Sequence, residues 1–288
     1  MDKQSIGIIG YGKLGKTLAL KFIENEQLKW VCSASACNEV PNGNKCYKAL
    51  KEISELTDII FITKADKYIK ETAEELTEIF GKQLSGKIII HCSGLFPKTL
   101  LKSCENKGAV IAKAHPYQTF YFPASDVLDN VFWTVDADSD FNLLNTIIKE
   151  ISGTAVNTNT NEKFNPVLYH ASAVMASNYM NTIVSLVANA ARESGINPAD
   201  FLPEILETTL NNIIHSLTNN VNFPLTGPIV RGDVITIEKH IEGLKDYKLL
   251  RNEYCRIGLS TAELAYKADH IDKKVYNTLI RTFLANID

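Results

Sequence analysis

The fold is decided near the start of the chain, where Ser5-Ile-Gly-Ile-Ile9 runs directly into Gly10-Tyr-Gly-Lys-Leu-Gly15. The first stretch predicts a buried strand, and the apolar spacing of Lys13–Glu24 predicts a helix behind it. In that context a Gly-x-Gly-x-x-Gly motif is typical of the loop that binds a dinucleotide pyrophosphate; a tight turn without ligand is the alternative. We therefore expect six cofactor-binding residues: Gly10, Tyr11, Gly12, Lys13, Leu14 and Gly15.

The rest of the first half alternates short apolar runs with helical patterns. Continuous apolar runs suit strands of a parallel sheet that is covered on both faces. The alternation predicts a doubly wound, mainly parallel α/β domain of the Rossmann type, with a second helix at Ala65–Phe80. The expected strands are Ser5–Ile9, Leu28–Ser33, Asp58–Thr63, Lys87–His91, Val110–Ala114 and Val131–Val135.

The second half changes character near Asn161, where strand signals almost vanish and long helical periods take over. We expect a dinucleotide-binding domain over residues 1–158 and an all-α domain over residues 159–288. The expected helices are Glu162–Glu193, a helix that begins at Asn197-Pro198, Val234–Leu244, Asp246–Ala268 and Ile271–Ala285.

One segment, Val167–Ala191, has no formal charge and is long enough to cross a bilayer. Its many hydroxyl, amide and imidazole groups would be costly in lipid, so we expect a buried helix of a soluble protein without a membrane partner. The N-terminus has no secretory pattern, which predicts a cytoplasmic location.

Charge and cysteine content exclude other classes. The 288 residues hold 30 Lys+Arg against 33 Asp+Glu without a dense basic block, so nucleic-acid binding is not expected. None of the six cysteines forms a Cys-x-x-Cys pair or a zinc spacing. We therefore expect reduced, mostly buried thiols, with neither a metal site nor a disulfide framework.

The choice of nucleotide depends on the end of the second strand. NAD sites usually carry an acidic residue there for the ribose hydroxyl, but Glu39 is the first acid after the strand. The hydroxyls of Ser33 and Ser35 would tolerate a 2′-phosphate, and Lys45 could add charge. NADP is therefore expected, with NAD as the alternative. At the ends of two further strands, the residues Thr63, Lys64, Ala65 and Ser93 are expected near the cofactor; otherwise they are plain loop residues.

The long helix carries a polar face that is poor in Lys and Glu. Lys163, His170, Ser177, Asn178, Asn181 and Ser185 share this stripe. Such a face suits the wall of a ligand cleft; a buried helix with satisfied polar groups and a subunit interface are the alternatives. His115, at the end of a strand, is placed for acid–base work or a structural hydrogen bond.

A shaped loop, Leu225-Thr-Gly-Pro-Ile-Val-Arg-Gly-Asp233, precedes another helix that Asp233 or Thr236 can cap. Arg231 is expected either to bind a carboxylate or phosphate or to pair with an aspartate. We expect substrate contacts from Arg231, Thr226 and Gln118, and catalytic roles for His170, Lys163, Asn178 and His115.

A family resemblance extends over almost the whole chain. The segments that carry it are Gly10–Gly15, His91-Cys-Ser-Gly94, His115–Phe120, Tyr169–Val174 with Ser177-Asn-Tyr179, and Leu225–Asp233. The sequence resembles the Rossmann-like NADP oxidoreductases whose second domain is helical and uncharacterised. It is more distantly similar to pyrroline-5-carboxylate reductase, ketopantoate reductase and 6-phosphogluconate dehydrogenase. That similarity implies an all-α domain like the one at the C-terminus of 6-phosphogluconate dehydrogenase, closing the nicotinamide cleft and forming a homodimer. The lysine–asparagine pair of those dehydrogenases is not reproduced.

The resulting hypothesis is an NADP-dependent oxidoreductase that transfers a hydride between nicotinamide and a small carbonyl, imine or hydroxy-acid substrate. His170 or Lys163 would act as the acid, with Asn178 as its orienter. The main alternative is a non-catalytic NADP-binding redox sensor, or a regulatory or scaffold protein. A prephenate-dehydrogenase-like enzyme is a third hypothesis, suggested by His115-Pro116.

Overall fold

The computed structural model describes residues 3–41, 43–138 and 140–288. The chain divides into two compact units, Met1–Tyr179 and Met180–Asp288. The first includes the helical turns that follow residue 158, because these turns pack with the sheet. The boundary that we expect at residues 158 and 159 stays a prediction about independently folding domains.

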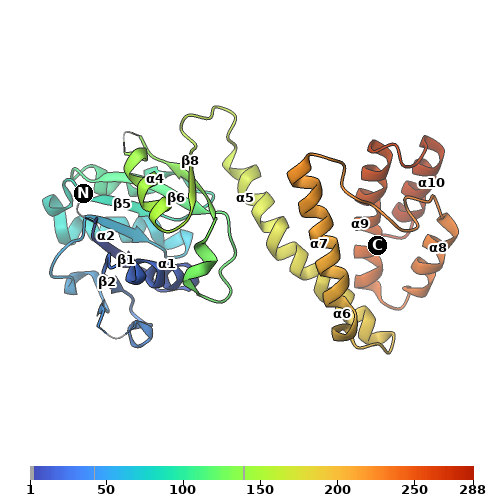
Figure 1. The fold of residues 1–288 in the computed structure, drawn as a ribbon, viewed down its shortest axis with the longest axis horizontal. Coiled ribbons are helices and arrows are strands. Elements are labelled where there is room, and N and C mark those ends of the chain that lie inside the picture. The colour runs from blue at the N-terminus through green and yellow to red at the C-terminus, as the bar shows by residue number, and fades with distance from the viewer. Residues whose placement is uncertain (1–2, 42, 139) are drawn as a thin grey trace. The chain divides into compact units, whose positions relative to one another are not determined.

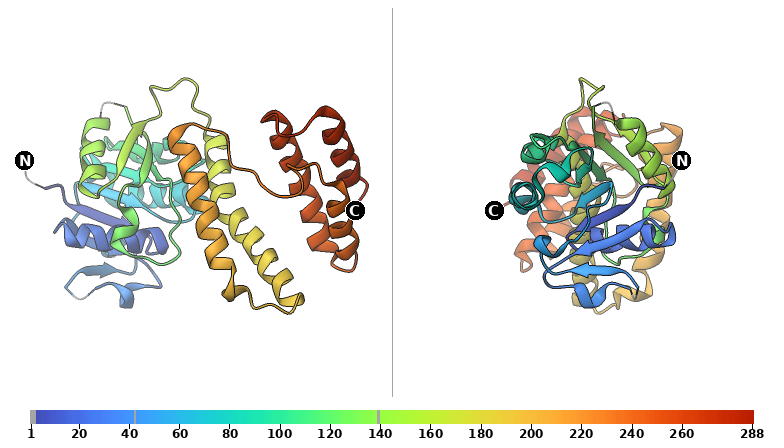
Figure 2. Two further views of the ribbon diagram at one scale, coloured as in Figure 1. Left: turned by 45° about the vertical axis from the view of Figure 1, so that its right-hand side comes forward. Right: turned by 90° about the vertical axis from the view of Figure 1, so that its left-hand side faces the viewer.

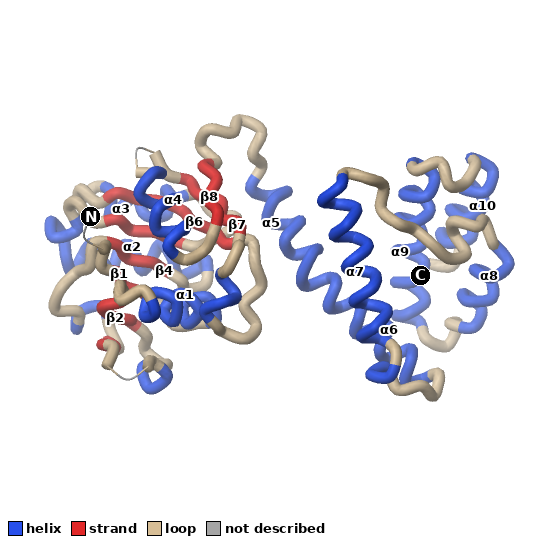
Figure 3. The backbone as a smooth tube through the Cα atoms, viewed as in Figure 1, coloured by secondary structure: helices blue, strands red, loops and turns tan. Residues whose placement is uncertain are grey.

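The first unit is built on one eight-stranded sheet (Figures 1 and 3), with strand order β3-β2-β1-β4-β5-β6-β7-β8. All neighbouring strands run parallel except β6 and β7, which are antiparallel. The strands are β1 (Ile6–Ile9), β2 (Leu28–Cys32), β3 (Lys45–Tyr47), β4 (Ile59–Ile62), β5 (Ile88–His91), β6 (Val110–Pro116), β7 (Phe132–Asp136) and β8 (Thr154–Asn157).

Helices cover both faces of this sheet. Ile8 points into a core that contains Leu18 and Phe22 of α1 (Lys13–Glu24) and residues of α4 (Phe141–Glu150). The next residue, Ile9, points into the opposite core, with α2 (Ile69–Phe80) and α3 (Lys102–Glu105). Successive strand residues face opposite sides, so a continuous apolar run is what two covered faces require. The expected doubly wound α/β domain is confirmed.

Six of the eight strands lie where the sequence predicts them. The two others, β3 and β8, were not predicted, because a three-residue edge strand and the polar Thr154–Asn157 carry little apolar signal. Short 3₁₀ turns join the elements: Cys37–Glu39, Leu50–Glu52, Asp66–Tyr68, Gly81–Leu84, Lys98–Leu101, Ser125–Leu128 and, in the second unit, Pro198–Asp200.

The expected helix Glu162–Glu193 is formed by three consecutive segments. Helix α5 (Pro166–Val174) begins at the N-cap Asn165, whose side chain accepts hydrogen bonds from two backbone N–H groups. A π-helical turn (Met175–Tyr179) leads into α6 (Met180–Glu193). The expected burial is wrong for this chain: α5 and the π-helical turn have no buried residue, and in α6 only Ala191 is buried.

The second unit continues with α7 (Leu202–Asn219), α8 (Val234–Gly243), α9 (Lys248–Lys267) and α10 (Lys273–Leu284) (Figure 2). Helices α8 to α10 share a core centred on Ile237, Cys255 and Phe283. Asp233 caps α8 as predicted, accepting from the N–H of Thr236. Among the described helices, none combines the length and the apolar character that a bilayer span needs.

The expectation of reduced thiols is wrong for two cysteines. Cys37 and Cys46 form a disulfide, with their Cα atoms 5.5 Å apart. The pairing of β3 with β2 brings these residues together, and the sequence does not reveal that pairing. The other four cysteines are free thiols.

Candidate functional site

The glycine loop joins β1 to α1 at the carboxyl edge of the sheet. Gly10 has a φ of +101°, which favours glycine, and a Cβ there would lie 3.0 Å from the backbone nitrogen of Lys64. At Gly15 a Cβ would lie 2.3 Å from the carbonyl oxygen of Gly10. A Cβ at Gly12, in contrast, would meet nothing within 4 Å. Two glycines therefore allow close packing, while the third faces open space.

A cleft of about 670 Å³ lies beside this loop. Thr63 closes the floor, because its hydroxyl donates to the carbonyl of Gly10 at 2.8 Å. Of the expected cofactor residues, Gly10, Tyr11, Gly12, Ser33, Ser35, Thr63, Lys64 and Ala65 line the cleft. Four others do not line it: Lys13 lies over the Tyr121 ring, Leu14 packs against the core, Gly15 packs on the loop, and Ser93 lies in the loop after β5.

The lysine that lies with Ser33 and Ser35 in this cleft is not the one that the sequence suggested. Lys45 lies on β3 and lines a separate small cavity with Trp30. Lys48, three residues later, lines the cleft together with Ser33 and Ser35. The strands β2 and β3 are parallel neighbours, so their carboxyl ends meet at one edge and bring Lys48 to the two serines. The sequence alone does not show that β3 pairs with β2, so it does not reveal that Lys48 lies near the two serines.

The loop after β5 has a structural role at its first residues. His91 is fully buried; its Nδ1 accepts from the N–H of Ser93 and its Nε2 lies 3.0 Å from the Pro97 carbonyl oxygen. Burial lowers the pKa of His91 to about 4. Ser93 is also buried, and its hydroxyl accepts from the N–H groups of Leu95 and Phe96. Ser93 therefore shapes the turn and does not line the cleft.

Gly94, in the same loop, lies against two histidines. A Cβ on Gly94 would lie 2.5 Å from Nδ1 of His170 and 2.9 Å from Nε2 of His115. The His115 and His170 rings are 5.8 Å apart, nearly perpendicular. Three segments that are far apart in the sequence, after β5, at the end of β6 and on α5, therefore meet at one point of the first unit.

These histidines border a second cavity, of about 270 Å³. Gln118 and Asn178, both predicted as site residues, also line it. Lys163 does not: it is exposed and precedes α5, so it lies outside the helical stripe on which it was placed. The complete lining is His115, Tyr117, Gln118, Thr119, His170, Ala173, Val174, Ala176, Ser177 and Asn178.

Burial sets the protonation state of His115. Desolvation, with the nearby His170 and Lys113, lowers the pKa of His115 to about 4. The ring is therefore neutral at physiological pH, and one nitrogen donates while the other accepts. Its Nδ1 lies 3.3 Å from the Tyr169 hydroxyl. Nδ1 of His170 is buried and has no hydrogen-bond partner within the described residues 3–41, 43–138 and 140–288.

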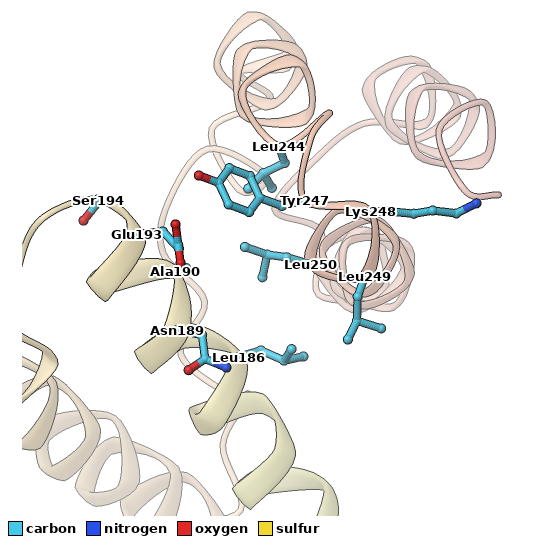
Figure 4. Close-up of a pocket in the computed structure, with 10 residues that line it drawn as sticks. All are labelled: Leu186, Asn189, Ala190, Glu193, Ser194, Leu244, Tyr247, Lys248, Leu249 and Leu250. Carbon is cyan, nitrogen blue, oxygen red and sulfur yellow. The ribbon is translucent and has the colours of Figure 1, made fainter.

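The second unit holds the remaining predicted residues. Arg231 is exposed, and its charge contributes to lowering the pKa of Asp233, although the Thr236 hydroxyl contributes more. Thr226 lines an apolar cavity of about 340 Å³ with residues of α6 and α9. A further groove of about 570 Å³ lies between α6 and the start of α9 (Figure 4). None of the predicted site residues lines this groove.

Across the described residues, which leave out 1–2, 42 and 139, no group of three or more His, Cys, Asp or Glu side chains is placed to hold an ion.

Together the doubly wound sheet, the packed glycine loop and the hydroxyl-lined cleft define a Rossmann-type dinucleotide-binding protein. Residues 5–94 match the family described as NADP oxidoreductase, coenzyme F420-dependent. Residues 131–261 match a domain of unknown function, DUF2520. The chain thus joins an NADP oxidoreductase domain to a DUF2520 domain, and the expected resemblance, enzyme class and NADP cofactor are confirmed.

Solved structures share this fold at low identity. A protein of Bacteroides fragilis proposed to be an NADP oxidoreductase has a TM-score of 0.69 at 20% identity, covering 87% of this chain and 95% of its own. Protein TM1727 of Thermotoga maritima has a TM-score of 0.65 at 21% identity, and the match covers 92% of this chain and 99% of that protein. Pyrroline-5-carboxylate reductase of Coxiella burnetii has a TM-score of 0.57 at 15% identity, and the match covers 100% of both chains. No curated protein matches the sequence.

Proposed function

We propose that this protein transfers a hydride between NADP and a small carbonyl, imine or hydroxy-acid substrate, with its chemistry at the histidine cavity. The observation that carries the proposal is the position of both cavities in the first unit. The glycine-loop cleft borders β1, β2 and β4, and the histidine cavity borders β6. Only β5 lies between β4 and β6, and Gly94 in the loop after β5 lies against the two histidines.

The residues of the cleft fit an extended dinucleotide. Gly12 leaves open space for a pyrophosphate at the N-terminus of α1, where free N–H groups favour an anion. Ser33, Ser35 and Lys48 form the end that would hold an adenosine 2′-phosphate. These residues would hold an NADP molecule at the carboxyl ends of β2, β1 and β4, and β4 adjoins β5, whose loop contains Gly94.

When bound, the nicotinamide supplies or accepts the hydride, and the protein handles the charge on the substrate oxygen or nitrogen. In the reducing direction that atom gains negative charge as its carbon takes the hydride, and it then needs a proton. Neutral His115 donates a hydrogen bond to it. His170 supplies the proton, and the amide of Asn178 on the same wall orients the substrate. Oxidation of a hydroxy acid runs through the same groups in reverse.

The cofactor assignment is tested by titrating the protein with NADPH and NADH while following nicotinamide fluorescence. We expect micromolar NADPH binding and much weaker NADH binding. Lys48→Ala should weaken NADPH binding about fivefold and leave NADH binding unchanged, because an exposed charge pair contributes roughly 1 kcal/mol. Lys45→Ala is the matched control, since this lysine lines another cavity. Equal effects of the two substitutions would contradict the proposed position of the 2′-phosphate.

Catalysis is tested with a panel of 2-keto acids, ketones, cyclic imines and prephenate. A reductase should oxidise NADPH with at least one of them, and His170→Ala should reduce that turnover without loss of fold or NADPH affinity. Tight NADPH binding with no turnover on any compound would instead favour the sensor or scaffold alternative. Unchanged turnover in His170→Ala would remove this residue from the mechanism.

We further propose a homodimer, located in the cytoplasm, that forms through the helical second unit. Large apolar side chains are exposed on α6 and α7, including Ile183 at 43%, Ile205 at 56%, Ile214 at 55% and Leu217 at 65%. Exposed large apolar side chains are typical of subunit interfaces. Arg231 and Thr226 of this unit then remain candidates for substrate contacts.

A further inference from the structure

We infer that Tyr169 is a positioning residue: its hydroxyl donates to Nδ1 of His115 and so keeps the proton of this imidazole on Nε2, the nitrogen beside Gly94. The inference rests on the proposed function for its catalytic consequence only. No pattern in the sequence singled out the Tyr169 side chain for a role, because its hydroxyl and the His115 ring meet only in the folded first unit.

Geometry separates the two nitrogens of His115. Nδ1 is 3.3 Å from the Tyr169 hydroxyl, whereas Nε2 is the atom that a Cβ on Gly94 would approach to 2.9 Å. Tyr169 itself does not line the cavity that His115 and His170 border. One nitrogen therefore faces a structural partner, and the other lies at the Gly94 end of the ring, beside His170.

The Tyr169 hydroxyl keeps its proton and is held from several sides. Burial raises the pKa of Tyr169 to about 12, with Tyr117 adding to this and the Thr134 hydroxyl opposing it. Thr134 is paired with His115 across β6 and β7. The Tyr169 ring packs against three others, His115 at 5.7 Å, Tyr117 at 5.0 Å and Phe164 at 5.4 Å between centroids.

A neutral imidazole has one donor and one acceptor, so its partner at one nitrogen decides the role of the other. With the Tyr169 proton directed at Nδ1, Nε2 carries hydrogen and can donate to a substrate atom that gains negative charge. With the opposite tautomer, Nε2 would carry a lone pair and repel that atom. Tyr169 thus selects the tautomer that suits reduction.

The test measures the ring nitrogens of His115 by ¹⁵N NMR, with His115→Gln to assign the signals. We expect the Nε2–H tautomer in the wild type, with or without turnover on any substrate. Tyr169→Phe keeps the ring contacts and removes the hydroxyl, so both tautomers should become populated. In the same variant kcat should fall roughly tenfold while KM stays within about twofold, as expected for one lost hydrogen bond.

Ser172→Ala is the matched control, because it removes a hydroxyl from the same turn of α5 that bonds to the Tyr117 hydroxyl and to the backbone carbonyl of Tyr169, and not to the His115 ring. It should alter neither the tautomer nor kcat. An Nδ1–H tautomer in the wild type would overturn the inference. So would a Tyr169→Phe variant with an unchanged tautomer, or with an altered tautomer and unchanged kcat. If the wild type turns over no substrate, the proposed function fails while the tautomer still decides the role of Tyr169.

Discussion

Replacing Gly94 with alanine is the sharpest test of the histidine cavity. The added Cβ would lie 2.5 Å from Nδ1 of His170 and 2.9 Å from Nε2 of His115. Ordinary contact begins at 3.4 Å, so the His170 ring must retreat by about 0.9 Å. A displacement of about 1 Å in a catalytic group can cost roughly 100-fold in rate, equivalent to about 2.7 kcal/mol in the barrier.

The assay compares kcat, NADPH affinity and unfolding temperature for wild type and variant. We expect kcat to fall by about two orders of magnitude, with NADPH affinity changed less than about threefold, because the glycine-loop cleft is untouched. Gly243→Ala is the control, since a Cβ there would meet nothing within 4 Å. In a double-mutant cycle, Gly94→Ala should lower kcat much less in the His170→Ala background than in the wild type. Wild-type turnover in folded Gly94→Ala would refute the argument that these histidines act on the substrate.

Two further predictions concern stability and assembly. His91 and His115 have pKa values lowered to about 4 from 6.5 by burial, so the unfolded chain binds up to two more protons between these pH values. These two histidines should therefore leave the free energy of unfolding unchanged above pH 6.5 and lower it by up to about 2.7 kcal/mol per pH unit as the pH falls below 6.5. Urea denaturation at a series of pH values measures this change, and a free energy of unfolding that stays constant from pH 6.5 to pH 4 would contradict it. Ile214→Glu, which places a charge on an exposed apolar position of α7, should halve the molecular mass measured by light scattering. Thr208→Glu on the same helix is the control and should leave the mass unchanged. A wild-type protein that is monomeric at micromolar concentration would contradict the proposed dimer.

Local sequence patterns were sufficient for most of the Rossmann unit. The apolar runs at Asp58–Thr63 and Lys87–His91 predict buried parallel strands because a strand covered on both faces has no polar side. The glycine motif predicts the loop conformation because only glycine tolerates the φ of Gly10 and the close packing at Gly15. The cap at Asp233 was equally visible, since a short polar side chain bonds the first free N–H groups of its own helix.

Other features depended on pairings between distant segments. Strand β8 and the Cys37–Cys46 disulfide depend on which strands become neighbours in the sheet. The sequence of a strand of three or four residues does not indicate which strand it pairs with. The sequence placed Lys163 in the polar stripe, yet Asn165 begins the helix after it. Exposure of α5 and α6 was likewise missed, because an uncharged segment looks buried until its surroundings are known.

The sequence by itself therefore determined the class of protein, which has a dinucleotide-binding loop, a doubly wound sheet and a helical C-terminal part. Local hydrophobic periodicity and the positions of the loop glycines were enough to predict these three features. Only the tertiary structure decided which side chains share a site. It placed Lys48, and not Lys45, beside Ser33 and Ser35, and it brought Gly94, His115, Tyr169 and His170 together. The physical reason is that the carboxyl ends of parallel strands gather residues far apart in the chain at one edge of a sheet, in an order set by strand pairing.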